Sequence, residues 1–109
     1  MRMDAEARFD AIVEEMAPLG VLPGALFGAR SLTVDGTAFA CLKNGHLAVK
    51  LGAGSAAHAA ALGLDGAELF DPSGRGRPFQ DWVAVSPAYA EEWASLAGAG
   101  LATVERRPA

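Results

Sequence analysis

Alternating apolar and polar residues in the middle of the chain predict two consecutive β-hairpins. Asp35-Gly36 and Asn44-Gly45 each stand between alternating segments. A type I′ turn needs positive φ at both central residues, which Gly adopts freely and Asn or Asp tolerates. We therefore predict a meander of three antiparallel strands, at Ala25–Val34, Thr37–Lys43 and His46–Leu51.

Two-residue turns also fix the register, so the side chains can be sorted by face. The first hairpin is predicted to pair Leu32 with Phe39 and Arg30 with Cys41. One face then becomes the predicted core face, formed by Ala38, Ala40, Leu42, Leu47, Val49 and Leu51. The other face is predicted to mix Arg30, Lys43, His46 and Lys50 with five apolar or small residues: Leu32, Val34, Phe39, Cys41 and Ala48.

That second face is more apolar than a solvated sheet surface needs to be. It could be ordinary surface apolarity, or part of the core if helices lie on both sides of the sheet. It could also be an interface formed by these five residues. We favour the interface, and therefore expect a homodimer or a complex with another protein.

One helical segment is predicted before the meander and two are predicted after it. The first, from Asp4 to Met16, places its apolar residues on one stripe at helical spacing. A short Ala-rich helix follows between Ser55 and Gly63, and a last helix begins after the N-cap Ser86, with Arg106 and Arg107 near its end. With two more short strands at Ala67–Phe70 and Asp81–Val85, the pattern predicts one α+β domain over residues 1–109.

Charge and length narrow the classes of partner. The chain of 109 residues carries a net charge of −4, whereas proteins that bind nucleic acid directly normally carry a basic surplus. No segment approaches the 18 or more apolar residues of a membrane span. The acidic, amphipathic start is not that of a secretory signal, and the single cysteine fits a reducing compartment. We therefore expect a cytoplasmic protein that binds neither nucleic acid nor membrane.

The residues that could carry chemistry form no catalytic constellation. Cys41 is predicted in mid-strand with no His or Asp placed to activate it, and free cysteines are usually buried as small hydrophobic residues. His46 and His58 do not combine with it in a metal-ligand spacing. We expect no enzymatic activity, no bound metal and no cofactor.

One loop has the composition of an anion site. Gly74-Arg75-Gly76-Arg77 places two arginines between glycines, and its backbone N–H groups would be open to an anion. A small anion or nucleotide could therefore bind Arg75 and Arg77, together with Lys50. The alternative is a flexible hairpin turn in which the arginines pair with Asp71 or Asp81.

Taken in order, several short motifs resemble the TfoX N-terminal-domain family, also called TfoX/Sxy-like. They are Leu26-Phe27-Gly28, Val34-Asp35-Gly36, the hairpin from Leu42 to Lys50, and the segment from Gly76 to Val85 before the closing helix. The resemblance implies a two-layer α/β sandwich with an antiparallel sheet, similar to the secretion-chaperone-like and YjbR-like folds. In that family, members with a further C-terminal helical domain are linked to regulation of natural competence. The resemblance supplies no catalytic residue and implies a small regulatory or protein-interaction module.

Overall fold

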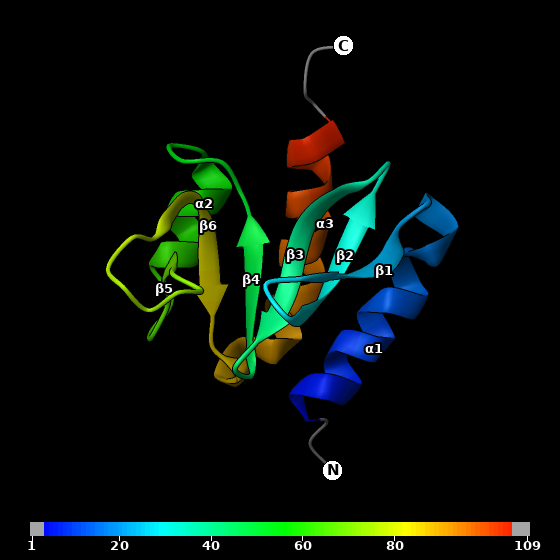
Figure 1. Cartoon of the computed structure of the whole chain (residues 1–109), viewed down its shortest axis with the longest axis horizontal. Coiled ribbons are helices and arrows are strands. Elements are labelled where there is room, and N and C mark those ends of the chain that lie inside the picture. The colour runs from blue at the N-terminus through cyan, green and yellow to red at the C-terminus, as the bar shows by residue number, and fades with distance from the viewer. Residues whose placement is uncertain (1–3, 106–109) are drawn as a thin grey trace.

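One antiparallel sheet of six strands forms the first layer of the fold, and the helices form the second (Figure 1). The computed structural model describes residues 4–105. The spatial order of the strands is β1-β2-β3-β4-β6-β5, with bounds Leu22–Leu26 (β1), Ala29–Val34 (β2), Thr37–Lys43 (β3), His46–Lys50 (β4), Glu68–Phe70 (β5) and Phe79–Val85 (β6). The helices are α1 (Ala5–Met16), α2 (Ala56–Leu62) and α3 (Trp93–Glu105), with short 3-10 helices η1 (Ala17–Leu19) and η2 (Pro87–Glu92). The predicted fold class is confirmed.

Both predicted hairpin turns are present with the expected backbone. Asp35 and Gly36 have φ of 50° and 78°, and Asn44 and Gly45 have 52° and 78°. A third turn of this form occurs at Phe27-Gly28, with φ of 54° and 71°. The predicted single strand Ala25–Val34 is therefore wrong, because this turn divides it between β1 and β2. A bulky residue such as Phe rarely adopts positive φ, so Phe-Gly is not one of the usual turn dipeptides.

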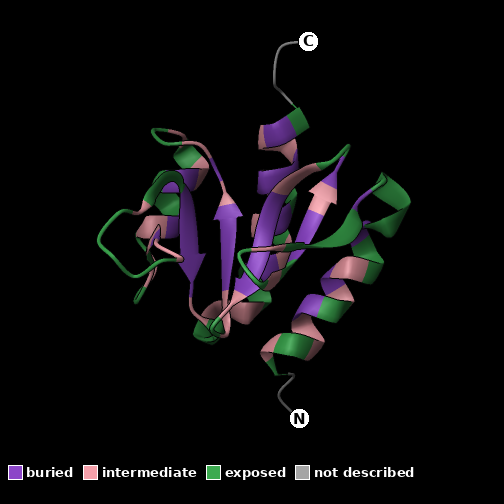
Figure 2. Cartoon of the chain, viewed as in Figure 1, coloured by how far each residue is buried: buried purple, intermediate pink, exposed green. Residues whose placement is uncertain are grey.

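Pro23 and Gly24 lie inside β1. β1 is an edge strand paired only with β2. Proline is tolerated at such an edge because no neighbour needs its missing N–H group. Most of β1 is exposed, in contrast to the buried central strands (Figure 2).

A β-bulge in β3 changes the predicted register. Leu32 faces Ala40 rather than Phe39, and Arg30 faces Leu42 rather than Cys41, with the shift between Leu32 and Thr33. Phe39 is the extra residue, and a bulge of this kind interrupts the alternation of side chains. Phe39 and Ala40 consequently both belong to the core on the helix side of the sheet, together with Leu32 and Val34.

Helix α3 crosses β3 and β4 at very short range. A Cβ atom on Gly100 would lie 2.6 Å from Val49 Cγ1 and 3.2 Å from both Phe39 Cδ2 and the Phe39 carbonyl oxygen. Only glycine fits at this position without displacing the sheet. Trp93, which begins the same helix, is fully buried in the core.

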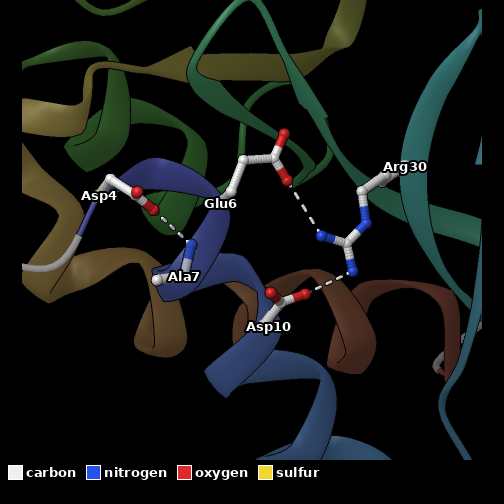
Figure 3. Close-up of polar contacts among 5 residues, drawn as sticks. All are labelled: Asp4, Glu6, Ala7, Asp10 and Arg30. Carbon is white, nitrogen blue, oxygen red and sulfur yellow. Dashed lines mark hydrogen bonds and ion pairs between the residues drawn. The ribbon is translucent and has the colours of Figure 1, made fainter.

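Helix α1 begins at a capping residue and is tied to the sheet by one arginine. The Asp4 carboxylate accepts a hydrogen bond of 2.7 Å from Ala7 N. Arg30 of β2 donates to Glu6 Oε2 at 3.0 Å and to Asp10 Oδ1 at 2.6 Å (Figure 3). Its guanidinium also lies 4.9 Å from the centre of the Phe9 ring. Hydrogen bonds to Asp10 and then Glu6 raise the pKa of Arg30, so it stays charged at every physiological pH.

The other two predicted helices are present, one of them in two parts. The Ser55 side chain caps α2, and His58 Nε2 lies 2.7 Å from the Gln80 carbonyl oxygen, which joins α2 to β6. Ser86 caps η2 as predicted, but the backbone forms a 3-10 helix before α3 begins. Arg106 and Arg107 lie outside the described residues. Within residues 4–105, no helix is long and apolar enough to cross a membrane.

The approach of α3 to the sheet generates a matched pair of substitutions. Gly100→Ala should destabilise the protein by about 1–3 kcal/mol, because the new methyl group overpacks Val49 and Phe39. Gly98→Ala, on the exposed side of α3 with nothing within 4 Å, should stabilise it by about 0.5–1 kcal/mol through helix propensity. Urea unfolding of both variants measures the difference, and equal midpoints would contradict the close approach.

Candidate functional site

The sheet face opposite the helices carries a row of small residues. Along one line of cross-strand partners the residues are Gly24, Ser31, Cys41, Ala48 and Ala84. Cys41, Ala48 and Ala84 are buried in a second apolar cluster that contains no helix residue. We call this side of the sheet the second face. Small side chains leave room there for other parts of the chain to fold over it.

Four aromatic rings cover the second face. They come from the β1–β2 turn (Phe27), from β5 (Phe70) and from β6 (Phe79 and Trp82). The Phe27 ring centre lies 6.0 Å from that of Phe70 and 5.3 Å from that of Phe79, and Phe70 lies 5.9 Å from Trp82. Because the β1–β2 turn and β5 belong to opposite edges of the sheet, these contacts show that the sheet curls until its two edges meet over the second face.

Two adjoining cavities open where the rings meet the loops. The larger, about 560 Å³, lies between the β3–β4 turn, β5 and the loop from Asp71 to Pro78, and it includes Lys43, His46, Glu68 and Ala84 in its wall. The smaller, about 330 Å³, is lined by Phe27, Lys43, Pro72, Ser73, Arg77 and Phe79. Lys43 and Pro72 belong to both walls, so the two cavities adjoin, and we call them together the groove at the rim of the second face.

Lys43 holds the β1–β2 turn beside this groove. Its Nζ donates a 2.9 Å hydrogen bond to the Phe27 carbonyl oxygen. An ammonium group has three N–H donors, so this contact leaves donor capacity for a ligand. Phe27 and Phe79 are 41% and 39% exposed although both rings are large and apolar. The groove therefore presents positive charge next to accessible aromatic surface.

The loop between β5 and β6 is built around the Asp71 carboxylate. Asp71 Oδ1 accepts hydrogen bonds from Ser73 Oγ at 3.0 Å and Gly74 N at 3.1 Å, and Oδ2 accepts one from Gly76 N at 2.9 Å. Arg75 N donates to Ser73 Oγ at 3.2 Å. Gly74 and Gly76 have φ of 68° and 76°, which lets the backbone turn its N–H groups inwards. The loop thus already contains an anion of its own.

These contacts also determine the acidity of Asp71. Desolvation by itself raises the pKa of the carboxyl group. Hydrogen bonds from Ser73 and from the backbone N–H groups of Gly76, Gly74 and Arg77 outweigh it, so the pKa lies below its ordinary value. The Asp71 carboxylate is therefore ionised near neutral pH and accepts these hydrogen bonds of the loop.

The structure separates the three residues predicted to bind an anion. Arg77 lines the smaller cavity, whereas Arg75 lies in the exposed part of the loop and lines neither cavity. Lys50 pairs with Trp82 at the far end of β4 and lines neither cavity either. The expectation of open backbone N–H groups is wrong at residues 74, 75 and 76, because Asp71 and Ser73 accept their hydrogen bonds. Among the described residues, the ion pairs are those of Arg30, so the alternative pairing with Asp71 or Asp81 is not formed.

The five residues predicted as an interface do not share one face. Leu32, Val34 and Phe39 lie in the core beneath the helices, and Leu32 and Phe39 are 0% exposed. Cys41 and Ala48 do lie on the second face, but both are 0% exposed beneath the aromatic rings. The bulge at Phe39 explains the first error, and the curl of the sheet explains the second. A substitution such as Phe39→Asp would disrupt the core rather than test a dimer.

Cys41 has the environment of a structural cysteine. Burial raises the pKa of its thiol to about 11, against an opposing effect of the nearby Lys43 charge. The thiolate is the reactive form, so this thiol is a poor nucleophile near neutral pH. Among residues 4–105, no group of three or more His, Cys, Asp or Glu side chains could hold a metal ion.

Comparison with known proteins adds no family assignment. No protein-family model matches the chain, and a search of curated proteins finds no match. The resemblance to the TfoX N-terminal domain stays a prediction.

Sequence reasoning missed the residues at the centre of the groove, which are Phe27, Lys43 and Phe79. Lys43 and Phe79 carried no signal, because each stands among ordinary strand residues. Phe27 did carry one. Phe27-Gly28 precedes an alternating segment just as Asp35-Gly36 does, so its glycine could have been taken as the second residue of a turn.

The enclosed Asp71 carboxylate predicts a titration of the loop. Because the pKa of Asp71 is lowered in the native state, the loop contacts are fully present above the unfolded-state pKa of about 3.9. The contacts are lost as the pH falls through the lower native-state pKa. The amide resonance of Gly76 should therefore titrate with a midpoint below about 3.9. The titration should be absent in Asp71→Asn and unchanged in Asp65→Asn. A midpoint at the ordinary Asp value would contradict the hydrogen-bonded carboxylate.

Burial of Cys41 predicts slow alkylation. At pH 8 the native protein should react with iodoacetamide about a hundredfold more slowly than the chain in guanidinium, because far less thiolate is present. Mass spectrometry of timed aliquots measures both rates. A native rate as fast as that of the unfolded chain would show an exposed, activated thiol and would reopen the possibility of cysteine chemistry.

Proposed function

We propose that this protein is a small, non-enzymatic regulatory or interaction module that binds its ligand in the groove at the rim of the second face. The observation that carries the proposal is the pair of adjoining cavities, about 560 and 330 Å³, lined by partly exposed aromatic rings and by Lys43, His46 and Arg77. Cavities of this size with a few convergent polar groups are typical of small-molecule sites.

The groups at the groove favour binding over catalysis. Cys41 lies beneath the rings with a raised pKa, and the Asp71 carboxylate accepts the hydrogen bonds of its own loop. His46 Nδ1 lies 3.2 Å from the Asn44 carbonyl oxygen within the β3–β4 turn. These contacts support a site that supplies shape, apolar surface and positive charge.

The wider role is also part of the proposal. A regulatory module of the TfoX N-terminal type, located in the cytoplasm, would use this groove to sense a ligand or to hold a partner. Phe27 and Phe79 replace the five residues predicted from sequence as the apolar contact surface for a second copy or for another protein.

Chemical-shift mapping with a mixed fragment library tests the proposed site. Acidic, basic and neutral fragments should shift amides that cluster at residues 43–46, 68–78 and 84, which surround the groove. Light scattering on the same sample gives the oligomeric state. Hits confined to the helix side, or spread without a cluster, would contradict a binding site on the second face.

A further inference from the structure

The smaller cavity has a more specific composition than the groove as a whole. It is formed by three segments that are distant in the sequence, namely the β1–β2 turn, the end of β3 and the β5–β6 loop. The β1–β2 turn contributes the Phe27 ring and β3 contributes Lys43, while the β5–β6 loop and the first residue of β6 contribute Arg77 and the Phe79 ring. Rings and cations therefore surround the same space.

From this arrangement we propose that the smaller cavity binds a small organic anion with a flat aromatic ring, such as an aryl carboxylate. Its ring would pack against Phe27 and Phe79, and its carboxylate would lie between Lys43 and Arg77. This inference rests on the proposed function and names the class of ligand for that site.

The two rings are arranged to receive a flat group. Their centres are 5.3 Å apart and their planes are tilted by 46°, so the two faces do not cover each other and both rings stay about 40% exposed. A ligand ring packed against them would gain the offset or edge-to-face contacts that aromatic groups prefer. Phe27 also adopts a φ of 54°, a backbone conformation that is costly for a bulky residue, in order to place its ring here.

Within residues 4–105, neither of the two cations forms an ion pair. The ion pairs in residues 4–105 are those of Arg30 with Glu6 and Asp10. The nearest acid on the loop, Asp71, has its oxygens occupied by Ser73 and by backbone N–H groups. The lining of the smaller cavity thus holds two cations, Lys43 and Arg77, and no acid among the described residues, whereas Glu68 and Asp71 line the adjoining larger cavity. A carboxylate between them would accept charge-assisted hydrogen bonds.

The size of the cavity limits the ligand. About 330 Å³ lies at the lower end of the range for ligand sites, which suits a body of one or two rings. A longer substituent could extend past Lys43 and Pro72 into the larger cavity, since both residues belong to both walls.

A matched set of probes tests the ligand class on the full chain. 2-Naphthoate supplies ring and charge, 2-naphthalenemethanol supplies the ring alone, and acetate and inorganic phosphate supply the charge alone. The amide shifts of Phe27 and Phe79 measure the binding of each probe. Naphthoate should bind at least about tenfold more tightly than the alcohol, which is the effect expected of a charge-assisted hydrogen bond. Acetate and phosphate should not shift these amides at the same concentration.

Variants assign the contacts. Arg77→Met should weaken naphthoate binding about tenfold, whereas Arg75→Met, in the same loop but outside the cavity wall, should leave it unchanged. Lys43→Met should also weaken it, and Lys43→Arg, which keeps both the charge and an N–H donor for the Phe27 carbonyl oxygen, should restore it. Phe27→Asn keeps a residue that tolerates positive φ but removes the ring, and should weaken binding about fivefold.

Several outcomes would overturn the inference. Equal affinities for the alcohol and naphthoate would show that the cavity does not select an anion. The same conclusion would follow if naphthoate affinity were unchanged in both the Arg77→Met and the Lys43→Met variants. The proposed function would stand in either case if fragments still map to the groove. If no probe and no fragment shifts the groove amides, the inference and the proposed function both fail.

Discussion

Phe39 packs against α3 at the point where Gly100 leaves room for it, and this contact determines how both faces of the sheet are used. The bulge in β3 turns Phe39 and Ala40 to the same side, so the helix-side core gains a large ring directly beneath the helix. Beyond the bulge, Cys41 and its small cross-strand partners face the other way. The large residues of β3 are thus concentrated under the helices, and the centre of the second face is left with small side chains.

The second face is closed by the edges of the sheet rather than by a second layer of helices. Small residues along its centre let the β1–β2 turn and the β5–β6 strands approach each other, and four aromatic rings fill the space between them. The closure is incomplete, because Phe27 and Phe79 stay partly exposed where the loops meet. The groove lies at that gap, so its position follows from the curvature of the sheet.

The charges are distributed so that the smaller cavity is lined by cations in an acidic protein. Arg30 is paired with two carboxylates of α1, which fixes that helix to the sheet. Asp71 is surrounded by N–H and O–H donors, which fixes the β5–β6 loop. Lys43 and Arg77 are the cations of the smaller cavity, and neither has such an acidic partner among the described residues. The same loop therefore closes one side of the cavity and presents Arg77 to it.

Local signals in the sequence were sufficient for the fold class and for most of the elements, although not for the division of Ala25–Val34 between β1 and β2. The Asp-Gly and Asn-Gly turns, the apolar stripe of α1, and the N-caps Ser55 and Ser86 each depend on neighbouring residues alone, and each is present in the structure. Only the tertiary structure decided the bulge at Phe39, the curl of the sheet and the grouping of Phe27, Lys43, Arg77 and Phe79. The bulge depends on the fit of Phe39 beside Gly100, 61 positions away, and the groove depends on contacts between opposite sheet edges. Short-range patterns determine backbone conformation, whereas packing between distant segments determines which side chains meet.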